Sequence, residues 1–178
     1  MKMKNIIILI LVVALGWSLY QLKNGKSIGE TGTISQNYDA VIKGQVETAV
    51  SMLDAINKKV EAREMTLVKG KKLAADLLRD LRYGTDKQGY FWADTTEGIN
   101  VVLYGKKEIE GKNRLNDEVK GVKYVQEIIK KAQQGGGFTD YFYPKKNEQE
   151  PKSKRAYSLE FKPFNWVVGT GYYLEDIK

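Results

Sequence analysis

The chain begins with a pattern of hydrophobic positions that is typical of a membrane segment. Residues 6–20 (IIILILVVALGWSLY) carry no charge and are almost entirely apolar, with lysines before and after them. The run is just long enough to span a hydrocarbon layer, and Trp17 and Tyr20 stand where interfacial aromatic side chains belong. We expect a retained transmembrane signal anchor over residues 1–23, with a cleaved signal peptide as the alternative. A polar, glycine-rich linker follows at residues 24–32.

Apolar side chains recur with helical spacing over the next fifty residues. Thr33 and Gln36 match a capping box at the start of this segment. Positions three or four residues apart then define one face of a helix, formed by Val46, Ala49, Leu53, Ile56 and Val60. We expect the pattern to continue, with a break near Gly70, to a C-cap at Gly84. This second part carries Leu73, Leu77, Leu78 and Leu81.

From residue 89 onward the apolar period changes to two, which is typical of strands. We expect strands at residues 90–94, 99–104, 138–143, 155–161 and 165–172, the first two forming a hairpin. Between the second and third strands, a helix capped by Asn116 or Asp117 is expected to run to the glycines at 135–137. Short turns between sequential strands favour an antiparallel sheet, so the sequence predicts an α+β domain over residues 33–178.

Composition removes several classes of chemistry. The 178 residues include no Cys and no His, which excludes thiolate–imidazole zinc sites, haem ligated by those residues, a Ser-His-Asp triad and a cysteine nucleophile. The net charge is +7, but basic and acidic residues are mixed along the chain, whereas nucleic-acid binders gather their cations on one stripe. The acids are scattered over turns and helix starts. We therefore expect a binding protein that is not an enzyme, has no metal or cofactor and binds no nucleic acid.

Short motifs follow one another in a fixed order along residues 35–178. They are Leu81-Arg82-Tyr83-Gly84 with Gly89-Tyr90-Phe91-Trp92-Ala93-Asp94, Glu110-Gly111-Lys112-Asn113, Gly136-Gly137-Phe138-Thr139-Asp140-Tyr141, Lys154 with Tyr157, and Phe164-Asn165-Trp166 running on to Tyr172. In order and spacing they resemble the single-Cache (type 2) extracellular sensor domains of methyl-accepting chemotaxis receptors and sensor histidine kinases. The resemblance implies a PAS-like fold: a long N-terminal helix behind a five-stranded antiparallel sheet, with a ligand pocket on the sheet's other face. It also implies small carboxylate ligands such as acetate, propionate, pyruvate or lactate.

Two positions depart from the family's pattern. The family often carries His-Pro at the end of its second strand, where this chain has Tyr104-Gly105. The family's Asp-x-x-Gly at the middle helix appears here with one extra residue, as Asp117 and Gly121. The first departure replaces a pocket imidazole with a phenol.

Alternation along the first strand places Tyr90, Trp92 and Asp94 on one face and Phe91 and Ala93 on the other. Phe91 and Ala93 form an apolar face that can pack against the long helix. The Tyr90 face is then expected to look into the pocket. A small anion needs one fixed cation and several neutral donors in an enclosed site. The expected ligand-binding residues that supply these groups are Tyr90, Trp92, Tyr104, Tyr141, Tyr143 and Lys154.

Other interpretations of these residues stay open. Tyrosines on antiparallel strands often form cross-strand pairs with their hydroxyls at the surface, and Lys154 lies in a lysine-rich stretch that also suits a solvated loop edge. An aromatic pocket could instead hold a cation such as a quaternary amine, provided that Asp94 or Asp140 faces inward and Lys154 outward. Arg82 either covers the pocket or caps the end of the helix before it.

Taken with the resemblance, the sequence predicts an extracytoplasmic small-molecule sensing domain of a chemotaxis or other transmembrane signalling receptor. It would be held in the cell inner membrane by its N-terminal helix, with the sensor domain on the periplasmic or extracellular side. The alternative is a free-standing, membrane-anchored ligand-binding module without its own output domain. The chain stops at Lys178, where a receptor of this family would enter a second membrane helix. A homodimer through the long helix is a further association that the resemblance allows.

Overall fold

The structure, a computed structural model, describes residues 36–177. The expected membrane segment, the linker and the Thr33 cap lie outside the described residues. Within residues 36–177, no helix combines the length and the apolar character that crossing a membrane requires.

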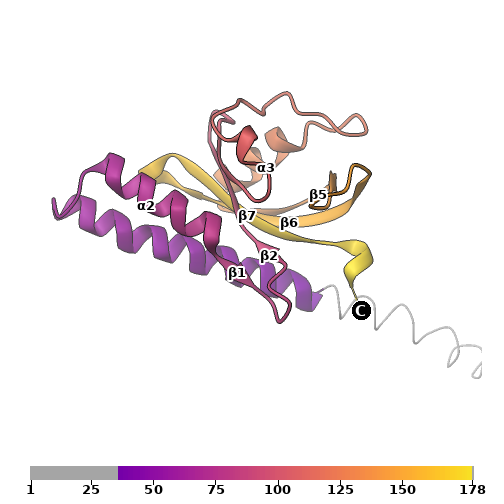
Figure 1. The fold of residues 1–178 in the computed structure, drawn as a ribbon, viewed down its shortest axis with the longest axis horizontal. Coiled ribbons are helices and arrows are strands. Elements are labelled where there is room, and N and C mark those ends of the chain that lie inside the picture. The colour runs from indigo at the N-terminus through magenta and orange to yellow at the C-terminus, as the bar shows by residue number, and fades with distance from the viewer. Residues whose placement is uncertain (1–35, 178) are drawn as a thin grey trace, which may run out of the picture. The chain divides into compact units, whose positions relative to one another are not determined.

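Two helices fold back on each other along one face of a sheet (Figure 1). The first runs over residues 36–61 and the second, α2, is Leu67–Asp80. The break between them precedes Gly70: residues 62–66 form the turn, and the Thr66 side chain caps α2 by accepting a hydrogen bond from the Lys69 N–H. Gly70 instead permits close packing, because a Cβ there would lie 2.6 Å from the Cγ2 atom of Val60.

The second helix ends earlier and buries fewer leucines than the spacing predicts. Leu81 already has an extended backbone, and Gly84 (φ 84°) lies in the turn that follows. On α2 the fully buried positions are Gly70, Ala74 and Leu78, whereas Leu73 and Leu77 are exposed. The expectation of a continuous leucine face is therefore wrong: the small residues of α2 face the neighbouring helix and the sheet.

The sheet has five antiparallel strands in the order β4-β3-β7-β6-β5. Its strands are β3 (Trp92–Thr95), β4 (Asn100–Leu103), β5 (Gly137–Pro144), β6 (Pro151–Phe161) and β7 (Trp166–Tyr173). A separate two-stranded ribbon, β1 (Arg82–Tyr83) with β2 (Gly89–Tyr90), precedes it. The expected α+β architecture, with a long helix packed on a five-stranded antiparallel sheet, is confirmed (Figure 1).

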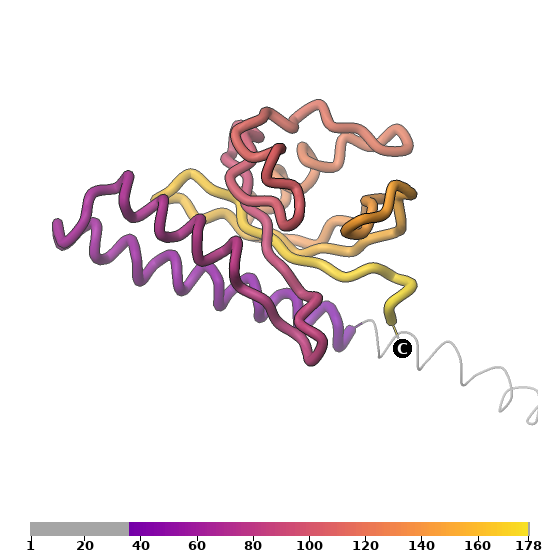
Figure 2. The backbone as a smooth tube through the Cα atoms, in the orientation of Figure 1, coloured from indigo at the N-terminus to yellow at the C-terminus, as the bar shows by residue number. Residues whose placement is uncertain are grey.

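The segment between β4 and β5 passes over the opposite face of the sheet (Figure 2). It contains a 3-10 turn at Lys107–Ile109 and the helix α3, Tyr124–Gln133. The expected helix start at Asn116 or Asp117 is wrong, because the backbone φ is positive at Lys120 (51°) and Gly121 (79°), which interrupts a right-handed helix. The glycines after Gln133 end α3 as predicted.

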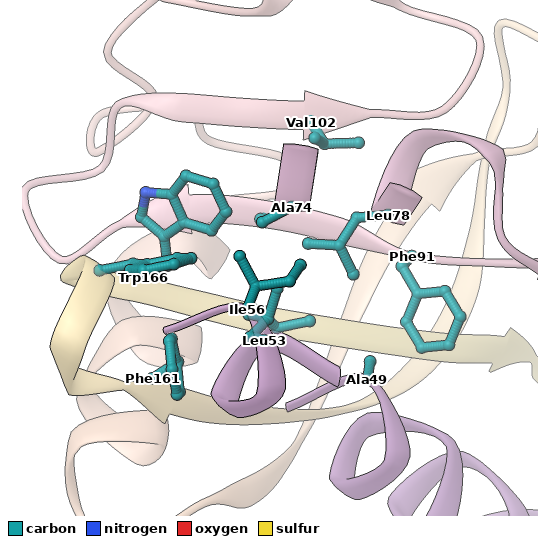
Figure 3. Packing of buried hydrophobic residues seen from close by; sticks show 12 residues of the cluster. Ala49, Leu53, Ile56, Ala74, Leu78, Phe91, Val102, Phe161 and Trp166 are labelled. Carbon is teal, nitrogen blue, oxygen red and sulfur yellow. The ribbon is translucent and has the colours of Figure 1, made fainter. Parts of the chain in front are cut away.

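The sheet separates two apolar clusters. On the helix side, Leu53 and Ile56 of the first helix meet Ala74 and Leu78 of α2 and Phe91 at the edge of β3 (Figure 3). The cluster on the other side contains Trp92, Leu103, Tyr124, Val125, Ile128, Ile129, Tyr141 and Tyr143. The predicted alternation is thus confirmed, and it places the Trp92 face beneath α3.

Candidate ligand-binding site

A small cavity lies between the Trp92 face of the sheet and α3. It is lined by Tyr90, Trp92, Asp94, Leu103, Arg114, Tyr124, Val125, Ile128, Tyr141, Tyr143 and Lys154. The cavity has a volume of about 10 Å³, which is space for about one water molecule. The cavity is therefore narrow, and its lining combines aromatic walls with buried charges.

Five of the six residues that the sequence nominates line this cavity. They are Tyr90, Trp92, Tyr141, Tyr143 and Lys154, so the fold gathers side chains from β2, β3, β5 and β6 that lie up to 64 positions apart in the chain. Whether they bind a ligand stays a prediction.

Tyr104 is the sixth, and the structure places it outside the cavity lining. Its ring lies 5.2 Å from the ring of Tyr90, and the Arg82 guanidinium stacks 3.7 Å from its centroid. Lys146 Nζ donates to the Tyr104 hydroxyl at 3.0 Å. Arg82 also donates from Nη1 to the Arg79 and Leu81 carbonyls. Tyr104 thus covers Tyr90 from outside, and Arg82 caps the end of α2.

Lys154 is the unusual group of the cavity, because its side chain is charged and only 2% exposed. Its Nζ donates to the Tyr90 hydroxyl at 2.7 Å, and it lies over the rings of Trp92 (5.2 Å) and Tyr173 (5.0 Å). No carboxylate among residues 36–177 forms an ion pair with it. The alternative of a solvated loop edge is wrong, since Lys154 points into the interior from β6.

The cavity also contains hydroxyls that are free to donate. Within the described part of the chain, no hydrogen bond engages the hydroxyl of Tyr141 or Tyr143. Burial raises the pKa of Tyr141 well above its ordinary value, and burial likewise raises the pKa of Tyr143. Burial also opposes ionisation of Tyr90, but the Lys154 ammonium lowers the pKa of Tyr90 overall. The two unpaired phenols therefore stay neutral donors.

Arg114, which sequence reasoning missed, supplies a second buried cation. It is 4% exposed, and each of its three nitrogens has an acceptor: Nε donates to Asp117, Nη1 to Asp94 and Nη2 to the Tyr124 hydroxyl. Asp94 also accepts a hydrogen bond from Asn100 Nδ2 at 2.8 Å. Burial raises the pKa of Asp94, an effect that the Arg114 charge opposes.

One signal in the sequence indicates that Asp94 needs a buried partner. Asp94 shares its strand face with Trp92, and an acid on a buried face needs a cationic or hydrogen-bonding partner. No pattern identified that partner, because Arg114 lies in an irregular loop twenty positions away. The alternative of a cation-binding pocket required Lys154 to face outward, and it faces inward. Within residues 36–177, no group of three or more acidic side chains could hold a metal ion.

The opposite face of β6 contacts the first helix. Arg155 follows Lys154 on the strand, and its side chain donates from Nε and Nη2 to Asp39 and from Nη1 to Asp140. Tyr172, the cross-strand partner of Arg155, donates from its hydroxyl to Asp39 at 2.9 Å. Lys154 is paired in the same way with Tyr173. Two consecutive residues of β6 therefore contact different features: Lys154 lines the cavity, and Arg155 contacts the first helix.

The sequence profile of the Single Cache domain 2 family matches residues 34–178. The chain belongs to this family. Among curated relatives, the sensor histidine kinase MctS of Rhizobium johnstonii is 30% identical over 140 residues, which are 78% of this chain and 29% of that protein. The methyl-accepting chemotaxis protein McpP of Pseudomonas putida is 26% identical over 136 residues, 75% of this chain and 24% of that protein. The chain thus spans less than a third of the length of either relative.

Solved structures give the same result. The periplasmic sensor domain of a chemotaxis protein superposes with a TM-score of 0.72 at 26% identity, covering 78% of this chain and 96% of that one. A Cache chemosensory domain studied for carboxylic acid recognition has a TM-score of 0.74 at 23% identity, covering 80% and 97%. At that identity the second likeness shows the fold alone. The family expected from the sequence motifs, a Cache sensor domain related to chemotaxis receptors and sensor histidine kinases, is confirmed.

Proposed function

We propose that this domain is the extracytoplasmic sensing part of a transmembrane signalling receptor and that it binds a small organic acid through its carboxylate group. The observation that carries the proposal is the Lys154 ammonium, which is buried without a carboxylate partner among the described residues and lines the same cavity as the unpaired phenols of Tyr141 and Tyr143. That the domain is not an enzyme, and that it pairs with a second copy through its long helix, stay predictions.

Charge balance favours an anionic ligand. An ammonium removed from water without a counter-ion costs several kcal/mol, and Lys154 has only the Tyr90 hydroxyl as a hydrogen-bond acceptor within residues 36–177. A carboxylate would accept its remaining N–H donors and neutralise it, and the hydroxyls of Tyr141 and Tyr143 would complete the site. The related Cache domain studied for carboxylic acid recognition supports this ligand class.

Binding requires the cavity to open. An acid of two or three carbon atoms needs more room than one water molecule, so part of the lining must move. The strands are tied together by backbone ladders, and residues 111–114 are joined to residues 98–100 by backbone hydrogen bonds. Residues 104–109, by contrast, form a turn and a 3-10 turn that contact the site through side chains such as Lys106 over Tyr143. We expect this segment to move, so that a ligand favours the open arrangement by its differential affinity.

Strand β6 connects the site with the first helix. Lys154 faces the cavity, and the next residue, Arg155, holds Asp39 of the helix. A ligand that draws Lys154 and Tyr173 together would also shift the neighbouring cross-strand pair, Arg155 and Tyr172. Because both of these residues contact Asp39, the N-terminal end of the first helix would shift with them. In a receptor, that helix would pass the displacement toward the membrane.

A thermal-shift screen of the full chain tests the ligand class. Acetate and propionate are expected to raise the melting temperature, because a ligand that binds only the folded state adds about 2.7 kcal/mol at a hundred times its Kd. Ethylamine and tetramethylammonium are expected to have no effect. Lys154→Met should abolish the carboxylate shift, and Lys152→Met, at a position already paired with Glu150, should leave it unchanged. A full shift in the Lys154 variant would refute the proposed contact.

The receptor and the free-standing module differ in what the gene encodes after Lys178. The family relatives are much longer than this chain, which favours the receptor. Reading the gene past this codon is expected to show a second apolar segment followed by a signalling domain. A stop codon at that point would favour the free-standing module.

A further inference from the structure

The cavity contains two buried cations that differ in how their charges are balanced. Lys154 and Arg114 both line it, and both are almost fully buried. All three guanidinium nitrogens of Arg114 have acceptors, at 3.1 Å to Asp117, 3.4 Å to Asp94 and 2.7 Å to the Tyr124 hydroxyl. Lys154 has one acceptor within residues 36–177. The protein's own carboxylates therefore balance the charge of Arg114, whereas Lys154 has no carboxylate partner within residues 36–177 and is open to an anionic ligand.

The balance of charge inside the cavity follows from these contacts. Asp94 is 1% exposed, and its negative charge offsets that of Arg114. Asp117 also contacts Arg114, but its side chain is 44% exposed, so water screens its charge. One uncompensated positive charge remains in the cavity, at Lys154. A ligand with one carboxylate neutralises it, whereas a second carboxylate would share the cavity with Asp94 and find no free cation.

We infer that Asp94 is a specificity-determining residue, which restricts the site to acids with a single carboxylate by occupying Arg114. The inference rests on the proposed function, because it presupposes that Lys154 binds a carboxylate. Asp94 acts here through its charge and its hold on Arg114, so removing the charge while keeping the shape should relax the selectivity.

Propionate and malonate are suitable probes, since both have three carbon atoms and differ by one carboxylate. Calorimetric titration of the full chain at pH 8, where malonate is a dianion, should show propionate binding at least about 100-fold more tightly. In Asp94→Asn, the ratio of malonate affinity to propionate affinity is expected to rise at least about tenfold, a change of about 1.4 kcal/mol in the difference between the two binding free energies.

Two controls separate the freed guanidinium from simple loss of repulsion. In the double variant Asp94→Asn/Arg114→Gln the gain for malonate should disappear, because no cation then meets the second carboxylate. Monomethyl malonate, which has the malonate skeleton but one charge, should bind the unmodified chain more tightly than malonate does. This comparison needs no variant, so it stands even where Asp94→Asn fails to fold.

The outcomes distinguish the inference from the proposed function. If the unmodified chain binds malonate as tightly as propionate, or if folded Asp94→Asn binds propionate without any gain for malonate, the role of Asp94 is refuted and carboxylate sensing stands. If neither acid binds the unmodified chain, the proposed function fails, and the inference fails with it.

Discussion

At Lys154 the protein buries a charge that folding alone disfavours. The ammonium contacts aromatic ring faces and donates a hydrogen bond to one phenol. No carboxylate among residues 36–177 compensates for the loss of its hydration. Replacing a buried charge by an apolar side chain of similar length is often stabilising. A group that costs stability in the unliganded protein is more easily understood as part of a binding site than as part of the core.

Lys154→Met is therefore expected to make the unliganded protein more stable, by about 1 to 2 kcal/mol in the free energy of unfolding. Urea denaturation of the two proteins without added acid measures this difference. Lys152→Met serves as the comparison, since that lysine is on the same strand but forms an ion pair at the surface. A marked loss of stability in the Lys154 variant would show that the ammonium supports the fold.

At the scale of elements, the contact between β6 and the first helix depends on a small polar cluster. Arg155 holds two carboxylates, Asp39 on the helix and Asp140 on β5, whose side chains are 20% and 62% exposed. The hydrogen bonds with Asp39 are the main cause that raises the pKa of Arg155. Tyr172 donates to the same carboxylate. This cluster fixes the helix to the strand that carries Lys154.

Asp39→Asn should lower the free energy of unfolding by about 1 to 2 kcal/mol, because charge-assisted hydrogen bonds contribute about that much. The matched variant Asp140→Asn, which removes an exposed partner of the same arginine, should cost less than about 1 kcal/mol. If β6 couples the site to the helix, Asp39→Asn should also bind propionate normally but lose the propionate-induced change in hydrogen exchange over residues 36–61. Equal exchange responses in both variants would contradict the coupling.

At the scale of the whole molecule, the sequence pattern predicts the structure best where both faces of the sheet are buried. Alternation worked along β3 because Phe91 and Trp92 face two different apolar clusters. Tyr104, which is nominated because it stands at the family's His position, does not line the cavity, because it comes after the last residue of β4 and lies in a turn. The contact between Asp94 and Arg114 depends on how an irregular loop folds, which no local spacing encodes.

Apolar spacing predicts the buried face of one helix correctly and that of the other incorrectly. Apolar spacing identified the buried face of the first helix, since Leu53 and Ile56 are both in the core. On α2 the spacing of leucines misled, because the close approach of the helices selects Gly70 and Ala74 at the contact. The positive φ angles of Lys120 and Gly121 make α3 begin later in the chain than the sequence predicts. Only the structure shows which residues of a loop adopt a positive φ.

The buried tyrosines predict how the stability of the whole domain responds to alkaline pH. Burial is the main cause that raises the pKa of Tyr83 and of Tyr124 to about 12. Between pH 10 and about 12 the unfolded chain releases protons that the folded chain retains, so stability must fall as the pH rises, by about 1.4 kcal/mol per pH unit for each such group.

Thermal unfolding between pH 9 and 12 measures this slope. Tyr83→Phe, which removes one titrating phenol and its hydrogen bond with Thr170, should make the slope shallower. Tyr104, which is half-buried outside the cavity, is the comparison, because a variant there leaves the buried phenols in place. An unchanged slope in Tyr83→Phe would show that this phenol does not contribute.

The most direct test of the account is a crystal structure of the domain grown with propionate. We predict the carboxylate within about 3 Å of Lys154 Nζ, with hydroxyls of Tyr141 and Tyr143 turned toward it, Arg114 still held by Asp94, and residues 104–109 displaced outward. Propionate bound at Arg114 or on the outer surface, with the lysine cavity still closed around Tyr90, would contradict it.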